Sequence, residues 1–182
     1  MNRIEIEAKL NKDRAWLLET YAALSDPELR HAVTASEHDP STRWSALDHL
    51  VHLAGIERNF NRMIRRHFEG DANPVGLTNS DDGTARTREQ IMATVHAMNE
   101  DWVARYRDAS FSEVVALGQA ARGETLALLV SLTDEQIAEQ LPGAPWSDGS
   151  VGGVFATNAD HGRQHWRWIK EGVATAEGRK PS

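Results

Sequence analysis

The stretch WSALDHLVHLAGIERNFNRMIRRHFEG, residues 44–70, decides the fold class of this chain. Apolar residues recur in it at three- and four-residue steps, which is the spacing of one buried face of an α-helix. Ser45, with Asp48 three residues later, gives the stretch a capping box at its start, and Gly70 follows its end. The pattern predicts a long, half-buried helix over residues 45–68.

The same helical spacing recurs along most of the remaining chain. Further capping signals occur at Ser25–Glu28, at Thr87–Gln90, at Ser110 or Ser112, and at Thr133–Gln136. Helices are predicted over residues 2–24, 45–68, 87–106, 110–132 and 150–171, with a short turn after Pro27 and with Gly172 as the final stop. Loops are predicted where Gly, Pro, Asn and Asp gather, over residues 34–42, 70–85 and 142–153.

No segment alternates between apolar and polar residues with the period of a β-strand, and no internal repeat is visible. The predicted fold is therefore all-α, an antiparallel four-helix bundle with one or two extra short helices. A length of 182 residues suits one hydrophobic core. We expect a single domain over residues 1–175 and a flexible tail over residues 176–182.

Composition and charge exclude several classes of function. Asp and Glu number 27 against 20 Lys and Arg, and the resulting net charge of −7 argues against a nucleic-acid partner. Cysteine is absent, so any metal site must use His, Asp or Glu. The chain shows neither a signal peptide nor an apolar run long enough to cross a membrane, so we expect a cytoplasmic protein without membrane contact.

Two pairs of histidines are the candidates for chemistry. His161 and His165 lie four residues apart, so a helix places both imidazoles on one face, close enough to bind one cation. His49 and His52 lie three residues apart in the apolar helix described above, and spacing alone does not choose between them. Histidines of this kind can also be core residues that are satisfied by hydrogen bonds, so the pattern leaves both interpretations open.

The order of these motifs resembles a known family. Trp44 stands at a helix start, His52 follows eight residues later and Glu57 five beyond it, and the His161-x-x-x-His165 pair lies near the C-terminus. This arrangement is similar to the DinB/YfiT-like superfamily. The resemblance extends to the order of the long helices and to the stretches Ala121–Thr125 and Leu132–Glu135.

The resemblance implies a four-helix bundle that holds a divalent metal ion, usually zinc or nickel, with His52, His161 and His165. The family is similar in turn to mycothiol- and bacillithiol-dependent transferases and to the N-terminal domain of maleylpyruvate isomerase. Other members are described as metal-dependent hydrolases. It further implies a small-molecule substrate, a low-molecular-weight thiol as a possible cosubstrate, and a homodimer.

Three imidazoles leave at least one coordination position open, which is typical of a catalytic metal. A cation there lowers the pKa of a bound water toward about 7, or deprotonates a thiol, so a nucleophile forms without any cysteine. Glu57 is a candidate base or orienting group, although it can equally be an exposed helix glutamate. The side chains expected to orient the metal ligands are His49, Asp48 and Asn158.

Three functions follow from these motifs. The first is a metal-dependent enzyme that transfers a thiol or hydrolyses a bond, with Arg163, Arg167 or the arginines of residues 62–66 as candidate contacts for an acidic substrate. The second is a non-catalytic binding protein that uses the same pocket. The third is an interaction protein in which the histidines only pack.

Overall fold

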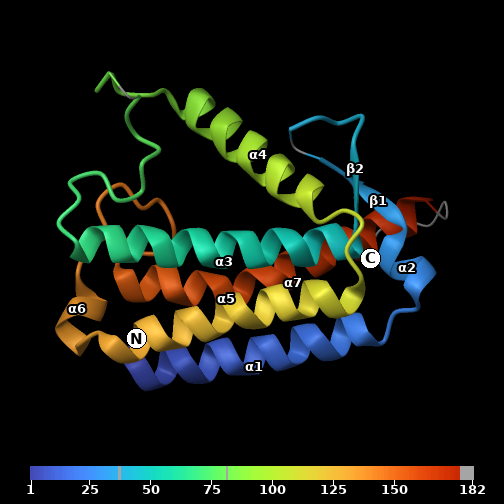
Figure 1. Cartoon of the computed structure of the whole chain (residues 1–182), viewed down its shortest axis with the longest axis horizontal. Helices are drawn as coiled ribbons and strands as arrows, with labels where there is room; N and C mark the ends of the chain where they lie inside the picture. The colour runs from blue at the N-terminus through green and yellow to red at the C-terminus, as the bar shows by residue number, and fades with distance from the viewer. Residues whose placement is uncertain (37, 81, 177–182) are drawn as a thin grey trace.

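Four long helices form the body of the computed structural model, which describes residues 1–36, 38–80 and 82–176 (Figure 1). They are α1 (Arg3–Ala22), α3 (Ala46–Phe68), α5 (Phe111–Ser131) and α7 (Val151–Ala176). α3 packs against α5 and α7, and α1 packs against the same two helices. The two short helices α2 (Asp26–Arg30) and α6 (Asp134–Ala138) connect these elements. The predicted all-α bundle with extra short helices is confirmed.

The directions of the four helices are not those of a simple up-and-down bundle. α3 and α5 run the same way, and so do α1 and α7, whereas α3 and α7 run in opposite directions (Figure 1). The cause is the long crossover of residues 69–110, which carries the chain back along the bundle so that α5 starts at the same end as α3. The expected antiparallel arrangement therefore holds for some neighbouring pairs only.

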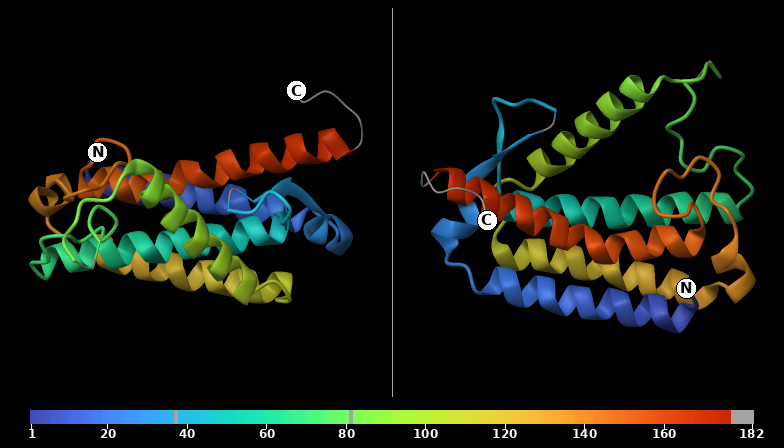
Figure 2. Two further views of the ribbon diagram at one scale, coloured as in Figure 1. Left: turned by 90° about the horizontal axis from the view of Figure 1, so that it is seen from above. Right: turned by 180° about the vertical axis from the view of Figure 1, so that it is seen from behind.

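Helix α4 (Arg88–Arg105) belongs to this crossover and leans away from the bundle, crossing over α3 at an angle (Figure 2, left). One contact fixes the crossing. The indole of Trp102 lies directly on Gly55, where a Cβ atom would come within 2.5 Å of the ring. The Trp102 Nε1 also donates a hydrogen bond of 2.7 Å to the carbonyl of Val51. The absence of a side chain at Gly55 thus allows α4 to rest on α3 at this point.

A small antiparallel hairpin, which no sequence pattern predicted, precedes α3. Its strands are β1 (Ala32–Ala35) and β2 (Arg43–Ser45), and Thr34 pairs with Trp44. The predicted loop over residues 34–42 is therefore wrong for Thr34 and Ala35. Strands of four and three residues are too short to show a period-two pattern, and Val33 is buried because β1 packs against α7.

The predicted stop at Gly172 is also wrong, because α7 continues to Ala176. This glycine allows α7 and β1 to lie close together. A Cβ atom at Gly172 would lie 2.9 Å from the carbonyl oxygen of Val33 in β1. Ala176 is helical, and the rest of the expected tail, residues 177–182, lies outside the described residues.

The predicted capping boxes are present at the N-termini of five helices, those of α2, α3, α4, α5 and α6. Each box satisfies backbone N–H groups that the first helical turn leaves unpaired, which is why the helix starts were readable from the sequence. Among the described residues, no helix is both long enough and apolar enough to cross a membrane.

Candidate metal centre

Four histidines from two helices meet inside the bundle. His49 and His52 come from α3, and His161 and His165 come from the antiparallel helix α7. One ring nitrogen from each of His52, His161 and His165 lies within 4.8 Å of the other two. The structure therefore brings together the three residues expected to bind the metal.

His165 stands at the centre of this group. Its Nε2 lies 3.1 Å from the Nε2 of His161, and its Nδ1 lies 2.7 Å from the Nδ1 of His49. The ring of His52 is packed beside it, with 4.7 Å between the ring centroids. His49, expected from the sequence to orient a ligand, is thus in direct contact with the side chain of one.

The buried position of the four rings keeps them neutral. Burial, and to a smaller extent the charge of His161, lowers the pKa of His49 to about 4, and burial lowers the pKa of His161 to about 4. The pKa values of His52 and His165 are lowered as well, first by burial and then by the neighbouring histidines. A neutral imidazole keeps a lone pair on one nitrogen, which is the form that binds metal ions.

The contact between His49 and His165 allows a test of whether these residues fit a metal ion. One of the two facing Nδ1 atoms must donate and the other must accept. If His165 donates from Nδ1, its Nε2 carries a lone pair that faces the Nε2 of His161. Metal-binding histidines commonly donate their second nitrogen in this way, which fixes the tautomer. With the His161 proton on Nδ1, the Nε2 lone pairs of both residues face one position across 3.1 Å, where a shared cation can bind them. The residues fit a metal ion.

Several buried nitrogen atoms of the histidines lack hydrogen-bond partners among the described residues. The buried Nδ1 of His52, Nδ1 of His161 and Nε2 of His49 have no hydrogen-bond partner among the described residues. Buried polar groups are nearly always hydrogen-bonded. If the histidines served only as packing residues, the desolvation cost of these nitrogen atoms would stay uncompensated. A metal ion can compensate this cost at His52, whereas the ion described above binds Nε2 of His161 and leaves Nδ1 of His161 and Nε2 of His49 unchanged.

Trp44 covers the α3 side of the group. Its ring centroid lies 5.3 Å from that of His52 and 5.4 Å from that of His49. Glu100 of α4 holds this ring, because its Oε2 accepts hydrogen bonds from Trp44 Nε1 at 2.9 Å and from Ser36 Oγ at 2.7 Å. Glu100 therefore ties the hairpin to α4. The sequence carried no signal for this residue, because its partners are distant along the chain.

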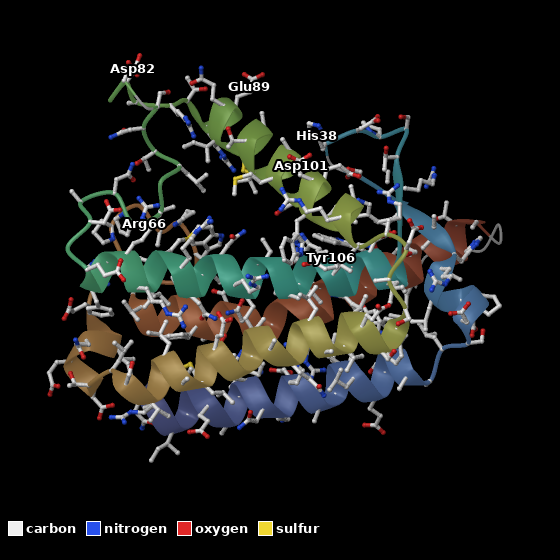
Figure 3. All side chains as sticks on the ribbon, viewed as in Figure 1. His38, Arg66, Asp82, Glu89, Asp101 and Tyr106 are labelled. Atoms are coloured by element: carbon white, nitrogen blue, oxygen red, sulfur yellow. The ribbon has the colours of Figure 1, made fainter. Side chains whose placement is uncertain are left out.

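A cleft of about 470 Å³ opens above the histidines, between α3, α4, α7 and the hairpin. All four histidines line it, so a small molecule in the cleft can reach the proposed metal position. His38, on the connection between the two strands, also borders the cleft and lies opposite α4 (Figure 3). The volume falls within the range of small-molecule sites.

Among the described residues, no hydrogen bond joins the side chain of Asp48 or Asn158 to a proposed ligand. Asp48 Oδ2 accepts hydrogen bonds of 2.8 Å from the N–H and the hydroxyl of Ser45, so this carboxylate caps α3. Asn158 lines a cavity of about 20 Å³ beside His161, and its Nδ2 is buried without a hydrogen-bond partner among the described residues. An orienting role for either residue stays a prediction.

Glu57 is 3% exposed and belongs to a buried ionic network on the α1 and α5 side of α3. Its Oε1 lies 2.5 Å from Arg122 Nε, and its Oε2 lies 3.0 Å from Arg14. Thr125 adds a hydrogen bond of 2.8 Å. The expected alternative of an exposed helix glutamate is wrong. Among the described residues, no hydrogen bond joins this carboxylate to a histidine, so its proposed catalytic role has no support from these contacts.

The arginines expected to contact an acidic substrate lie elsewhere. Arg163 pairs with Asp13 at 2.7 Å and stacks on the ring of Trp16. Arg66 pairs with Asp71 near the end of α3 farthest from His38 (Figure 3). These arginines, like Arg62, Arg65 and Arg167, are not among the residues that line the histidine cleft.

Comparisons with known proteins agree with this arrangement. The family model of the DinB superfamily matches residues 37–169, a range that contains both histidine pairs. The crystal structure of an uncharacterised protein from Escherichia coli UTI89 is similar over 98% of this chain and 96% of that chain, with a TM-score of 0.60. At 18% sequence identity this likeness shows the fold alone. No curated protein gives a significant match. The chain belongs to the DinB superfamily.

Proposed function

We propose that this protein is a divalent-metal-dependent enzyme that acts on a small molecule, by transferring a thiol or by hydrolysing a bond. The observation that carries the proposal is the meeting of His52, His161 and His165 within 4.8 Å at the base of an accessible cleft. A divalent ion bound there supplies a Lewis acid with an open side, which lowers the pKa of a thiol or water.

Each histidine has a distinct task in this proposal. His52, His161 and His165 hold the ion from α3 and α7, two helices that pack directly against each other. His49 accepts the Nδ1 proton of His165 and so keeps the opposite nitrogen free for the ion. Trp44 covers the α3 side of the group and limits the access of water there.

The contents of the cleft favour thiol transfer over hydrolysis by a carboxylate base; His38 and His96 line the cleft and are the histidine bases that hydrolysis would use. Hydrolysis commonly uses a carboxylate or histidine as general base beside the attacking water. No carboxylate lines the cleft among residues 1–36, 38–80 and 82–176, and Glu57 is engaged by two arginines. A thiol needs no such base once its pKa is lowered. Its sulfur bonds to an electrophilic carbon, the leaving group departs with its electron pair, and the thiol proton passes to solvent.

The lack of a carboxylate among the described lining residues also favours a second candidate, a protein that binds a ligand through the ion without changing it. Activity assays separate the two. The metal-loaded protein is incubated with a small thiol and an alkylating electrophile, and separately with ester and amide substrates. Turnover that disappears with the metal supports the enzyme, whereas tight ligand binding without turnover supports the binding protein.

The metal itself is tested first, by elemental analysis of protein purified without a histidine tag. Wild type is compared with the variants His52→Ala, His161→Ala and His165→Ala, and the exposed His31→Ala serves as the control. We expect one zinc, nickel or similar ion per chain in wild type and in the control, and loss of the ion in the other three variants. Folded wild type that takes up no added metal contradicts the proposal.

His49 gives a finer test. If it orients His165 without touching the ion, His49→Gln keeps the metal stoichiometry but weakens the affinity by roughly 10- to 100-fold. Competition with a chelator of known affinity measures this change. Complete loss of the ion in His49→Gln, with His52→Ala retaining it, would instead make His49 the ligand from α3.

A further inference from the structure

Helix α4 separates two clefts of opposite character. Met92, Val95, His96 and Asn99 line the histidine cleft, whereas Met98, Asp101, Trp102 and Arg105 line a second one. Both sets follow the three- and four-residue spacing of one helix face, so each cleft receives its own face of α4. The contact of Trp102 with Gly55 holds the helix between the two clefts.

The second cleft, here called the arginine groove, has a volume of about 480 Å³ and collects positive charge. Its four arginines are Arg58, Arg62, Arg65 and Arg105, against the two acids Asp101 and Glu124. Asp101 marks its α4 side in Figure 3. Anionic groups that approach α4 are therefore attracted to the groove, on the other side of the helix from the histidines.

The side chains of the histidine cleft form no such array of arginines, and the positive charge there is that of the proposed ion. Among the described residues, no Lys, Arg, Asp or Glu side chain lines it. Besides the four clustered histidines, the titratable residues of the described lining are His38 and His96. Glu100, behind the wall, is paired with Arg107 at 3.1 Å and accepts hydrogen bonds from Trp44 and Ser36.

Aromatic rings form much of the cleft wall. Trp44 and Trp168 flank the histidines, with the ring of Trp168 4.7 Å from that of His165. Phe60 and Trp146 pack on each other at 4.6 Å and line the cleft as well. Flat apolar walls favour flat apolar ligands, because stacked rings gain contact area and lose little conformational freedom.

We propose that the histidine cleft selects an uncharged aromatic molecule that presents one donor atom, a thiol sulfur or an oxygen, to the metal ion. This inference rests on the proposed function and names its substrate class. The donor atom meets the charge of the ion. A second anionic group held against the cleft wall would lose part of its hydration and find no Lys or Arg among the described lining residues.

A matched pair of thiols tests this selection. Phenylmethanethiol is uncharged apart from its sulfur, and 4-(sulfanylmethyl)benzoate adds one carboxylate across the ring. Binding of each is followed by quenching of tryptophan fluorescence, since Trp44, Trp146 and Trp168 line the cleft. We expect the carboxylate to weaken binding several-fold, because it loses part of its hydration without gaining a Lys or Arg partner. Equal affinities, tighter binding of the carboxylate, or no binding of either thiol overturns the inference.

Two methionine-to-lysine variants identify the cause of the preference for the uncharged thiol. Met92 and Met98 are similarly exposed, at 42% and 39%, but line the histidine cleft and the arginine groove respectively. Met92→Lys places a cation in the histidine cleft and should narrow the preference for the uncharged thiol several-fold. Met98→Lys adds the same charge on the other face and should leave the preference unchanged. An identical preference in both variants contradicts selection by charge.

The same samples separate failure of this inference from failure of the proposed function. Metal content is measured on each protein before titration, and binding is repeated after removal of the metal by a chelator. A chain that binds no metal yet still prefers the uncharged thiol supports the cleft chemistry and overturns metal-dependent catalysis. A metal-loaded chain that binds both thiols equally keeps the metal site and overturns the inference.

Discussion

Replacing Gly55 by alanine puts a methyl group where the indole of Trp102 lies. The added Cβ atom would come within 2.5 Å of Cδ1 and Nε1 of that ring, a distance that unstrained contacts do not show. The ring cannot move freely, because its Nε1 donates a hydrogen bond to Val51. Gly55→Ala must therefore displace Trp102, and with it the middle of α4.

The size of the effect is a balance of opposing contributions. Alanine in place of glycine inside a helix stabilises by about 1 kcal/mol. Overpacking costs about 1–3 kcal/mol. Loss of the Trp102 to Val51 hydrogen bond costs about 1 kcal/mol more. The net expectation is a decrease of roughly 1–3 kcal/mol in the free energy of unfolding.

Urea denaturation followed by circular dichroism measures this change, and Gly123→Ala is the matched control. Gly123 is an exposed position inside α5, and a Cβ atom there would meet nothing within 4 Å. The control should gain about 0.5–1 kcal/mol from helix propensity alone. If Gly55→Ala gains as much as Gly123→Ala, the contact does not hold α4, and the two-cleft description fails. A displaced α4 should also weaken binding of the uncharged thiol.

The remaining predictions concern the buried charges and the histidines. Glu57→Gln leaves buried Arg122 and half-buried Arg14 without a carboxylate and should cost about 3–5 kcal/mol of stability. Glu124→Gln, in an exposed pair, should change it by less than about 0.5 kcal/mol, and equal urea midpoints would contradict the network. Because the folded chain holds the pKa of His49 and of His161 at about 4, below the unfolded value of about 6.5, the unfolded chain binds more protons between these values. The stability of the metal-free protein should therefore rise as pH increases from 5 to about 6.5 and then level off, and urea unfolding that shows no such rise refutes buried, neutral histidines. Metal affinity of the folded chain should stay nearly constant down to about pH 5 and fall as the pH approaches about 4, where protons begin to compete for the imidazoles, and chelator competition at several pH values measures it.

Helix starts were predictable because capping is local. The boxes at Ser25, Ser45, Thr87 and Thr133 each involve residues three positions apart, so the sequence contains the whole interaction. The pair of His161 and His165 was readable for the same reason, as one helix face. The third ligand was different. Spacing left His49 and His52 equivalent, and only the family resemblance chose His52.

The tertiary structure decided what depends on contacts between distant residues. Glu57 reads as a helix glutamate in the sequence, but Arg14 and Arg122 come from α1 and α5, so its buried pairing depends on how three helices pack. Gly172 has the pattern of a helix stop, yet it accommodates the backbone of Val33 from a hairpin that the sequence did not reveal.

The sequence by itself therefore determined the helices, their starts and the residue types available for a metal site, because these follow from periodicity and local capping. Only the folded chain shows that α4 crosses α3 and contacts Gly55 through Trp102. It also shows that α4 separates the histidine cleft from the arginine groove. Each of these requires two helix faces to meet at one position. That meeting is fixed by packing across the bundle, which no local pattern records.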